Sequence, residues 1–227
     1  MRVLAAGSLK SVWPALMAYF PHSVDSLFGP AGLLRERIEA GEPCDLFASA
    51  NMAHPQSLLD NGQALSVIAF ASNTLCLTVR NEVLQADDDW FTLLTRNQLR
   101  LATSTAGTDP SGDYTQALFS RMGPAGEAVR QRAMPLVGGR DSVPVPDGRL
   151  AAEWLLRENQ ADLFIGYSSY QTALRQVNGL TVIDIPAVYN PRVAYGCAVI
   201  TPEAERLAQF LVSAQAKAVL RQAGFGD

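Results

Sequence analysis

The chain has 227 residues, of which 48% are hydrophobic and 18% are charged. This composition is that of an ordinary globular protein, and it excludes a disordered, collagen-like or disulfide-framework chain. The formal net charge is -4, from 18 Lys and Arg against 22 Asp and Glu, so the whole molecule attracts neither nucleic acid nor an acidic membrane surface. Any anion that the protein binds must therefore be held locally.

Short apolar runs alternate with amphipathic stretches along the chain, which is typical of an α/β protein with mainly parallel strands. The expected strands are 2–6, 23–28, 45–49, 100–104, 135–137, 162–167 and 180–185. The expected helices are 9–20, 31–40, 52–59, 90–94, 112–122, 125–133, 149–158 and 170–177, with one or two more after Thr201-Pro202. The pattern predicts helices packed on the faces of parallel sheets.

Two segments, Ser66 to Val79 and Val193 to Ile200, are candidate crossings from one sheet to another. They predict a discontinuous first lobe, residues 1–78 and 197–227, and an inserted second lobe, residues 79–196. We expect a ligand cleft between such lobes, with the two crossing strands acting as a hinge.

Small polar residues stand at four predicted junctions between a strand and the next helix. The junctions are Ala6-Gly7-Ser8-Leu9, Phe28-Gly29-Pro30-Ala31-Gly32, Asp109-Pro110-Ser111-Gly112-Asp113-Tyr114 and Gly166-Tyr167-Ser168-Ser169. At such junctions the first N–H groups of a helix are free to bind an anion. Each junction alone is a weak signal, since Ser8 could equally be a plain helix cap. Four together predict a polar or anionic ligand held by hydroxyls and backbone donors.

Several of these segments resemble the molybdate-binding protein of ABC importers. The resemblance is carried by Leu4 to Leu9, Leu34 to Ser49, Pro110 to Tyr114 and Ala161 to Tyr167, in matching order and spacing. It implies the two-lobed periplasmic binding protein fold and an oxyanion bound by neutral donors. Carried over to this chain, the implied ligand contacts are Ser8, Ala31, Gly32, Ser111, Arg149 and Tyr167. The resemblance implies no direct bond from protein to metal and no cofactor.

Two features depart from the family pattern. Ala31 stands where the family commonly has a serine, which removes one hydroxyl donor, and Asp113 would repel a dianion if it faced the ligand. Arg140 and Asp141 add charges near the expected cleft. These features leave open a different oxyanion or an organic acid as the ligand.

The expected function is that of a solute-binding protein that captures molybdate or tungstate for an ABC transporter permease, as a monomer. It is expected in the periplasm or cell envelope after signal removal, or in the cytoplasm, because Lys10 interrupts the only early apolar run. A cytosolic sensor module of the same fold is the alternative. An enzyme is not expected, because only His22 and His54 could serve as a base, and we place both in helix-flanking or surface positions. Cys44, Cys76 and Cys197 are expected in the core and show no metal-ligand spacing.

Overall fold

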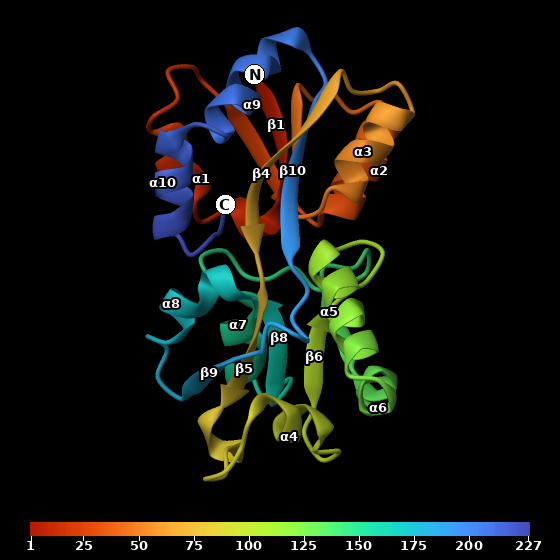
Figure 1. Cartoon of the computed structure of the whole chain (residues 1–227), viewed down its shortest axis with the longest axis vertical. Coiled ribbons are helices and arrows are strands. Elements are labelled where there is room, and N and C mark those ends of the chain that lie inside the picture. The colour runs from red at the N-terminus through yellow and green to blue at the C-terminus, as the bar shows by residue number, and fades with distance from the viewer. The chain divides into compact units, whose positions relative to one another are not determined.

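The computed structural model describes all residues, 1–227, and they form two compact units. The first unit is Met1–Asn73 with Arg192–Asp227, and the second unit is Thr74–Pro191. Each unit has one five-stranded sheet with helices on both of its faces (Figure 1). The predicted α/β class is confirmed for both units.

The sheet of the first unit has the strand order β2-β1-β3-β10-β4. Val3, Leu4 and Ala5 of β1 are fully buried, because helices cover both faces of this strand. The strands are β1 (Arg2–Ala6), β2 (Asp25–Gly29), β3 (Leu46–Ser49), β4 (Ser66–Asn73) and β10 (Val193–Val199). The helices are α1 (Trp13–Met17), α2 (Ala31–Glu39), α3 (Ala53–Asp60), α9 (Glu205–Leu211) and α10 (Ala214–Gln222), with short 3-10 helices η1 (Gly7–Leu9) and η4 (Pro202–Ala204). Helices α2 and α3 pack on one face, and α1, α9 and α10 lie on the other.

The sheet of the second unit has the strand order β7-β6-β8-β5-β9. The strands are β5 (Leu75–Arg80), β6 (Leu101–Ser104), β7 (Met134–Val137), β8 (Leu163–Tyr167) and β9 (Leu180–Asp184). The helices are α4 (Trp90–Thr95), α5 (Pro110–Arg121), α6 (Pro124–Arg132), α7 (Ala151–Arg157) and α8 (Gln171–Leu174), with η2 (Asn81–Val83) and η3 (Ser168–Tyr170). Helix α5 packs on β6 and α6, whereas α7 packs on β5 and β8.

Each sheet is mixed, with one strand that runs against the other four. In the first unit, β1 pairs in parallel with β2 and β3, and β10 is antiparallel to β3 and β4. In the second unit, β6 pairs in parallel with β7 and β8, and β5 is antiparallel to β8 and β9. Four of the five strands in each sheet run in the same direction, as the prediction of mainly parallel strands requires. Half of the neighbouring strand pairs are nevertheless antiparallel.

The two predicted crossings differ in structure. The segment from Ser66 to Val79 forms β4 in one sheet and β5 in the other, with a break at Thr74. The second crossing is not a shared strand, because β10 lies wholly in the first sheet and the chain passes between the units before it. Pro186 and Pro191 in the preceding loop explain this, since proline has no N–H to donate to a strand ladder.

The predicted helix over 9–20 is also shorter than expected. The chain forms η1 directly after β1, and α1 begins only at Trp13, with Pro14 in its first turn. Proline is tolerated in the first turn of a helix but not in its interior, so a helix that starts at residue 9 cannot run through Pro14 undisturbed.

No helix has both the length and the apolar character that crossing a lipid bilayer requires.

Asp162 holds the starts of β6 and β8 together. Its Oδ2 accepts hydrogen bonds from the backbone N–H (2.9 Å) and Nε (3.1 Å) of Arg100, and its Oδ1 accepts one from Nη2 (2.9 Å). The side chain of Asp162 is only 10% exposed. These hydrogen bonds and the positive charge of Arg100 lower the pKa of Asp162.

We therefore predict that Asp162→Asn lowers the free energy of unfolding at neutral pH by about 1.5–3 kcal/mol, the range for hydrogen bonds to charged groups. Because the pKa is lower in the folded protein, this stabilisation is present above the unfolded pKa, about 3.9, and is lost as the pH falls through the folded value. Urea unfolding at several pH values measures both effects. Asp227→Asn is the control, because Asp227 and its partner Arg221 are both 56% exposed and the change should be below about 1 kcal/mol. Equal losses in the two variants would contradict the prediction.

Candidate functional site

Parallel pairing brings two of the predicted junctions of the first unit together. Strands β1 and β2 are neighbours, and Ala6 at the end of β1 pairs with Gly29 at the end of β2. The next residues, Gly7-Ser8 of η1 and Pro30-Ala31 at the start of α2, therefore leave the sheet at the same edge. A Cβ added at Gly7 would lie 3.8 Å from the carbonyl oxygen of Gly29, which shows how close the two loops are.

The hydroxyl of Ser8 is fixed by a partner from the other end of the chain. Ser8 is 8% exposed, and its Oγ lies 2.8 Å from the phenol oxygen of Tyr195 on β10. Tyr195 is fully buried, with its ring against Phe70 and Phe225. These two hydroxyls are the polar side-chain groups that we identify at this edge of the sheet.

Helix α2 begins without a side-chain cap. Pro30 is its N-cap residue, and no side chain accepts a hydrogen bond from its first turn. The first N–H groups of an α-helix have no partner within the helix, so those of Ala31 and Gly32 are available to a ligand. Both residues are buried, and Ala31 offers no hydroxyl, as the sequence indicates. At the start of α2, therefore, the candidate donors to a ligand are backbone N–H groups.

The second unit also brings two junctions to one sheet edge. Strands β6 and β8 are parallel neighbours, and Ala102 pairs with Phe164. The segment after Ser104 and the end of β8 at Tyr167 therefore lie at the same edge. Tyr167 is the last residue of β8 and is 5% exposed. It lies on the same side of this unit as the start of α5.

Ser111 lies in the first turn of α5, and its N–H is already bonded. The N–H donates to Oδ1 of Asp109 (3.0 Å), and the carbonyl oxygen of Ser111 accepts a hydrogen bond from Oγ1 of Thr115 (2.8 Å). Ser111 is only 4% exposed, yet its own hydroxyl has no hydrogen-bond partner in the protein. A ligand that used the N–H of Ser111 would have to displace the carboxylate of Asp109.

Asp109 is the N-cap residue of α5. Burial raises the pKa of its carboxyl to about 6, although hydrogen bonds from the N–H of Ser111 and the side chain of Ser104 partly oppose this shift. Asp113 lies one turn further along and accepts a hydrogen bond from the N–H of Gly107 (2.8 Å). Asp109, and not Asp113, therefore places a carboxylate directly at the start of α5.

Arg149 has partners of its own within the second unit. Its N–H donates to the carbonyl oxygen of Pro146 (3.1 Å), and its guanidinium pairs with Glu158 (3.2 Å) and Glu153 (3.9 Å). Its backbone donor and its charge are both used within the second unit. Ser8, Ala31 and Gly32 thus gather at one edge and Ser111 with Tyr167 at another, and the guanidinium of Arg149 is paired with acidic side chains.

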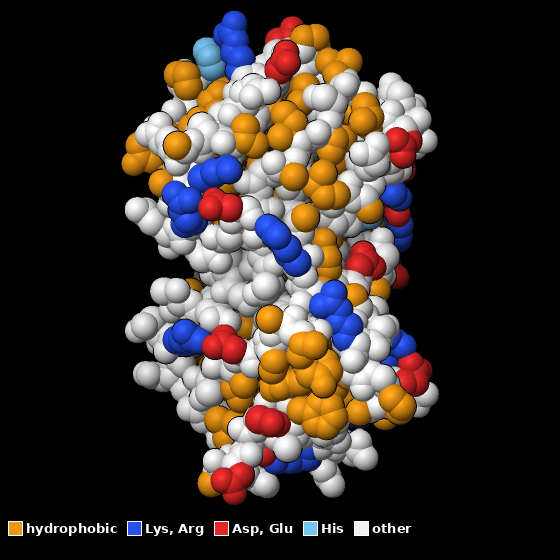
Figure 2. All heavy atoms as spheres, viewed as in Figure 1, with side chains coloured by type: hydrophobic (Ala, Val, Ile, Leu, Met, Phe, Trp, Pro, Cys, Tyr) orange, Lys and Arg blue, Asp and Glu red, His pale blue; other side chains and the backbone are white.

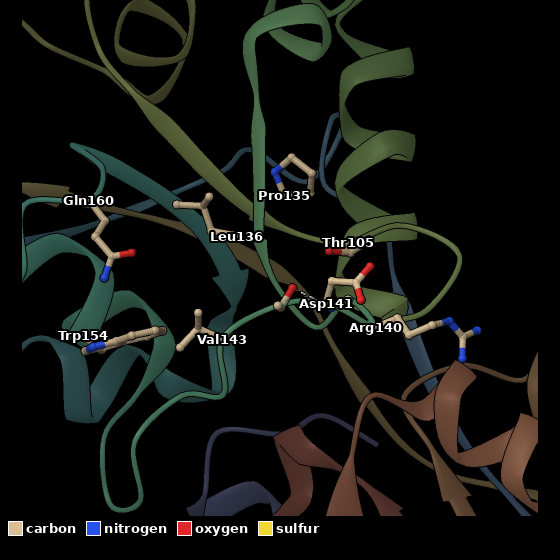
Figure 3. Close-up of a pocket in the computed structure, with 10 residues that line it drawn as sticks. Thr105, Pro135, Leu136, Arg140, Asp141, Val143, Trp154 and Gln160 are labelled. Carbon is tan, nitrogen blue, oxygen red and sulfur yellow. Dashed lines mark hydrogen bonds between the residues drawn. The ribbon is translucent and has the colours of Figure 1, made fainter.

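A separate hollow of about 430 Å³ lies in the second unit, between β7, α7 and the loop that follows β7 (Figure 3). Val143 and Trp154 lie side by side at one end, and the side chain of Arg140 extends away from them. None of the predicted ligand contacts lines it. The lining residues are Thr105, Pro135, Leu136, Gly139, Arg140, Asp141, Ser142, Val143, Trp154 and Gln160.

No group of three or more His, Cys, Asp and Glu side chains is arranged to hold a metal ion. Cys44, Cys76 and Cys197 are buried free thiols, which confirms their expected place in the core. The expected position of His54 is wrong, because it lies within α3 and is buried by the packing of that helix against the sheet. On the face that Figure 2 draws, basic side chains are scattered singly, often beside acidic ones, and form no continuous basic surface.

Two residues of these groups were not identified from the sequence as site residues. Tyr195 lies 187 positions from Ser8, and no local pattern connects them. Asp109 does carry a signal, since Asp followed by Pro is a common start for a helix, but the depth of its burial becomes evident only from the fold.

Comparison with known proteins supports the fold and the type of protein. Residues 2–226 match the family model of the bacterial extracellular solute-binding proteins. An uncharacterized protein of Pasteurella multocida is 46% identical over 99% of this chain and 98% of its own length. The molybdate-binding protein ModA of Escherichia coli is 26% identical over 98% of this chain and 87% of its own length.

A solved structure shows the same fold. The periplasmic molybdate-binding protein of Azotobacter vinelandii superposes with a TM-score of 0.78 over 99% of this chain and 98% of that one, at 21% identity. The predicted two-lobed periplasmic binding protein fold is confirmed by this similarity.

The start of α5 packs closely against the loop after β6, and a substitution at Gly112 tests this packing. A Cβ added at Gly112 would lie 2.4 Å from the backbone nitrogen of Ala106, so the loop after β6 could not keep its place. We predict that Gly112→Ala destabilises the protein by at least about 2 kcal/mol in thermal or urea unfolding. Gly7→Ala at the corresponding junction of the first unit is the control, because its added Cβ has only an ordinary contact at 3.8 Å. A Gly112→Ala protein as stable as the control would disprove this packing.

Proposed function

The chain belongs to the family of bacterial extracellular solute-binding proteins, and from this membership we propose that it captures a tetrahedral oxyanion for ABC-type import. Molybdate or tungstate is the proposed ligand, ahead of sulfate. The family and the fold are those of proteins that bind solutes, not of enzymes.

The observation that carries the proposal is the donor group of the first unit. The hydroxyl of Ser8 is held at 2.8 Å from Tyr195, beside the uncapped start of α2. A helix start without a side-chain cap combines unpaired N–H groups with the positive end of the helix dipole, and both favour an anion. Neutral donors of this kind suit an anion that carries no proton of its own.

The contacts of these side chains support a ligand that is held by hydroxyl and N–H groups and not by cationic side chains. The hydroxyl of Ser8 is hydrogen-bonded to another neutral hydroxyl, that of Tyr195, and Arg149 is paired with Glu153 and Glu158. Molybdate and tungstate need only donors, whereas an acceptor is required for an anion that brings its own proton. Size must then separate these two anions from sulfate.

The family membership also supports a cellular role. Extracellular solute-binding proteins deliver a small ligand to an ABC transporter permease, so we propose the periplasm or cell envelope as the site of action. The similarity to ModA, at 26% identity, supports molybdate as the first ligand to test.

We predict that molybdate and tungstate raise the melting temperature of the protein in a concentration-dependent way, because a ligand that binds only the native state stabilises it by mass action. Thermal-shift assays with molybdate, tungstate, sulfate, phosphate and small carboxylates provide the measurement. The first two anions should give the largest shifts at equal concentration. No shift with millimolar molybdate or tungstate would refute the proposed ligand and favour an organic acid.

We further predict that Ser8→Ala weakens molybdate binding by about tenfold or more, since one hydrogen bond to a charged ligand contributes about 1.5–3 kcal/mol. The same change costs stability, because it removes the hydrogen bond between Ser8 and Tyr195. Tyr195→Phe is the matched control: it breaks the same 2.8 Å hydrogen bond but leaves the hydroxyl of Ser8 in place. Isothermal titration calorimetry should find weak binding only in Ser8→Ala. Equal affinity in both variants would mean that Ser8 does not contact the ligand.

A further inference from the structure

The two helix starts of the candidate site differ in one respect that the proposed function does not explain. Helix α2 has no side-chain cap, whereas α5 is capped by the carboxylate of Asp109. Resemblance to the family implies that the N–H of Ser111 contacts the ligand. In this structure, that N–H donates to Oδ1 of Asp109 at 3.0 Å.

The position of Asp109 is tightly constrained. A Cβ added at Gly138, which has a φ of +75°, would lie 2.4 Å from Oδ2 of Asp109, so the loop after β7 packs directly on the carboxylate. The hydroxyl of Thr108 donates to the carbonyl oxygen of Gly138 (2.8 Å) and holds that loop in place. The carboxylate therefore has little room to move away when an anion approaches Ser111.

The hydroxyl of Ser111 is a second, independent sign of a ligand here. Ser111 is 4% exposed, and no protein group is hydrogen-bonded to its Oγ. A nearly buried hydroxyl with no acceptor in the protein is available to donate a hydrogen bond to a bound oxyanion. This hydroxyl and the N–H of the same residue lie beside Asp109.

An oxyanion at Ser111 would stand next to a buried carboxylate. Two adjacent negative charges in a site with little water repel each other strongly. One proton shared between the anion and the carboxylate removes this repulsion. On the basis of the proposed function, we propose that the second unit binds its oxyanion together with one proton, which Asp109 carries.

In this step, a proton from solvent bonds to a carboxylate oxygen of Asp109, and the resulting O–H donates to the oxyanion. No other bond forms or breaks. The titratable groups that act on Asp109 are Asp113 on the same helix and Tyr170 in the segment after β8. Burial raises the pKa of Asp109 to about 6, in the direction that this step requires. Proton uptake would thus make the affinity for an anion depend on pH as well as on the shape of the anion.

The test is the pH dependence of molybdate binding by the full chain, measured by titration calorimetry with micromolar molybdate from about pH 5.5 to about pH 8.5. The dissociation constant of the natural protein should rise by about tenfold per pH unit above the pKa of Asp109, as uptake of one proton requires. Titrations near pH 7.5 in two buffers of different ionisation enthalpy should give about one proton taken up per molybdate.

Asp109→Asn keeps a side-chain oxygen to accept from the N–H of Ser111 but cannot titrate. It should bind molybdate with an affinity that changes less than about threefold over the same pH range, with no proton uptake. Asp113→Asn is the matched control, because it removes a carboxylate one turn away that is bonded to Gly107. It should keep the pH dependence of the natural protein.

The outcomes separate the two proposals. Molybdate binding that is independent of pH in the natural protein would overturn the role of Asp109 and leave the proposed function intact. A pH dependence that survives in Asp109→Asn would also overturn it. Absence of binding of molybdate and tungstate at every pH would overturn both. If Asp109→Asn failed to fold, proton uptake by the natural protein and by Asp113→Asn would still decide the question.

Discussion

Parallel strand pairing is the constraint on which the candidate site depends. Because β1 and β2 run in the same direction and end level with each other, Ser8 and the start of α2 leave the sheet side by side. The parallel pair β6 and β8 does the same for the start of α5 and Tyr167 in the second unit. Antiparallel neighbours would place successive loops at opposite edges and separate these donors. The reversed strand β5 lies next to β8, and β3 separates the reversed strand β10 from β1, so neither interrupts these parallel pairs.

The same arrangement explains how a protein with a net charge of -4 can bind an anion. Its arginines are largely engaged with acidic partners, as Arg100 is with Asp162 and Arg149 with Glu158. What remains at the strand ends is a set of dipoles, which are the hydroxyl of Ser8 fixed by Tyr195, the hydroxyl of Ser111 and the N–H groups of helix starts. The first unit offers these dipoles without an opposing charge, whereas the second sets Asp109 among them. The two units therefore present chemically different groups at their strand ends.

Much of this fold could be predicted from the sequence, because each strand or helix is encoded by one continuous apolar or amphipathic segment. The buried strand Arg2–Ala6 and the helix that starts at Ala31 are found where the pattern places them. The partner of Ser8 could not be predicted, because Tyr195 comes from β10 through tertiary packing alone. In the second unit, a buried carboxylate accepts a hydrogen bond from the N–H of Ser111, a contact that the resemblance does not imply.

The central claim is that an oxyanion binds at these strand ends. Anomalous diffraction from crystals grown with tungstate tests it most directly, because tungsten scatters strongly enough to be located without prior assumption. The account predicts a single tungsten position per chain whose oxygens lie within hydrogen-bonding distance of Oγ of Ser8 and the N–H groups that begin α2. A tungsten position in the hollow beside Val143 and Trp154, or a fully occupied site without contact to Ser8, would contradict it.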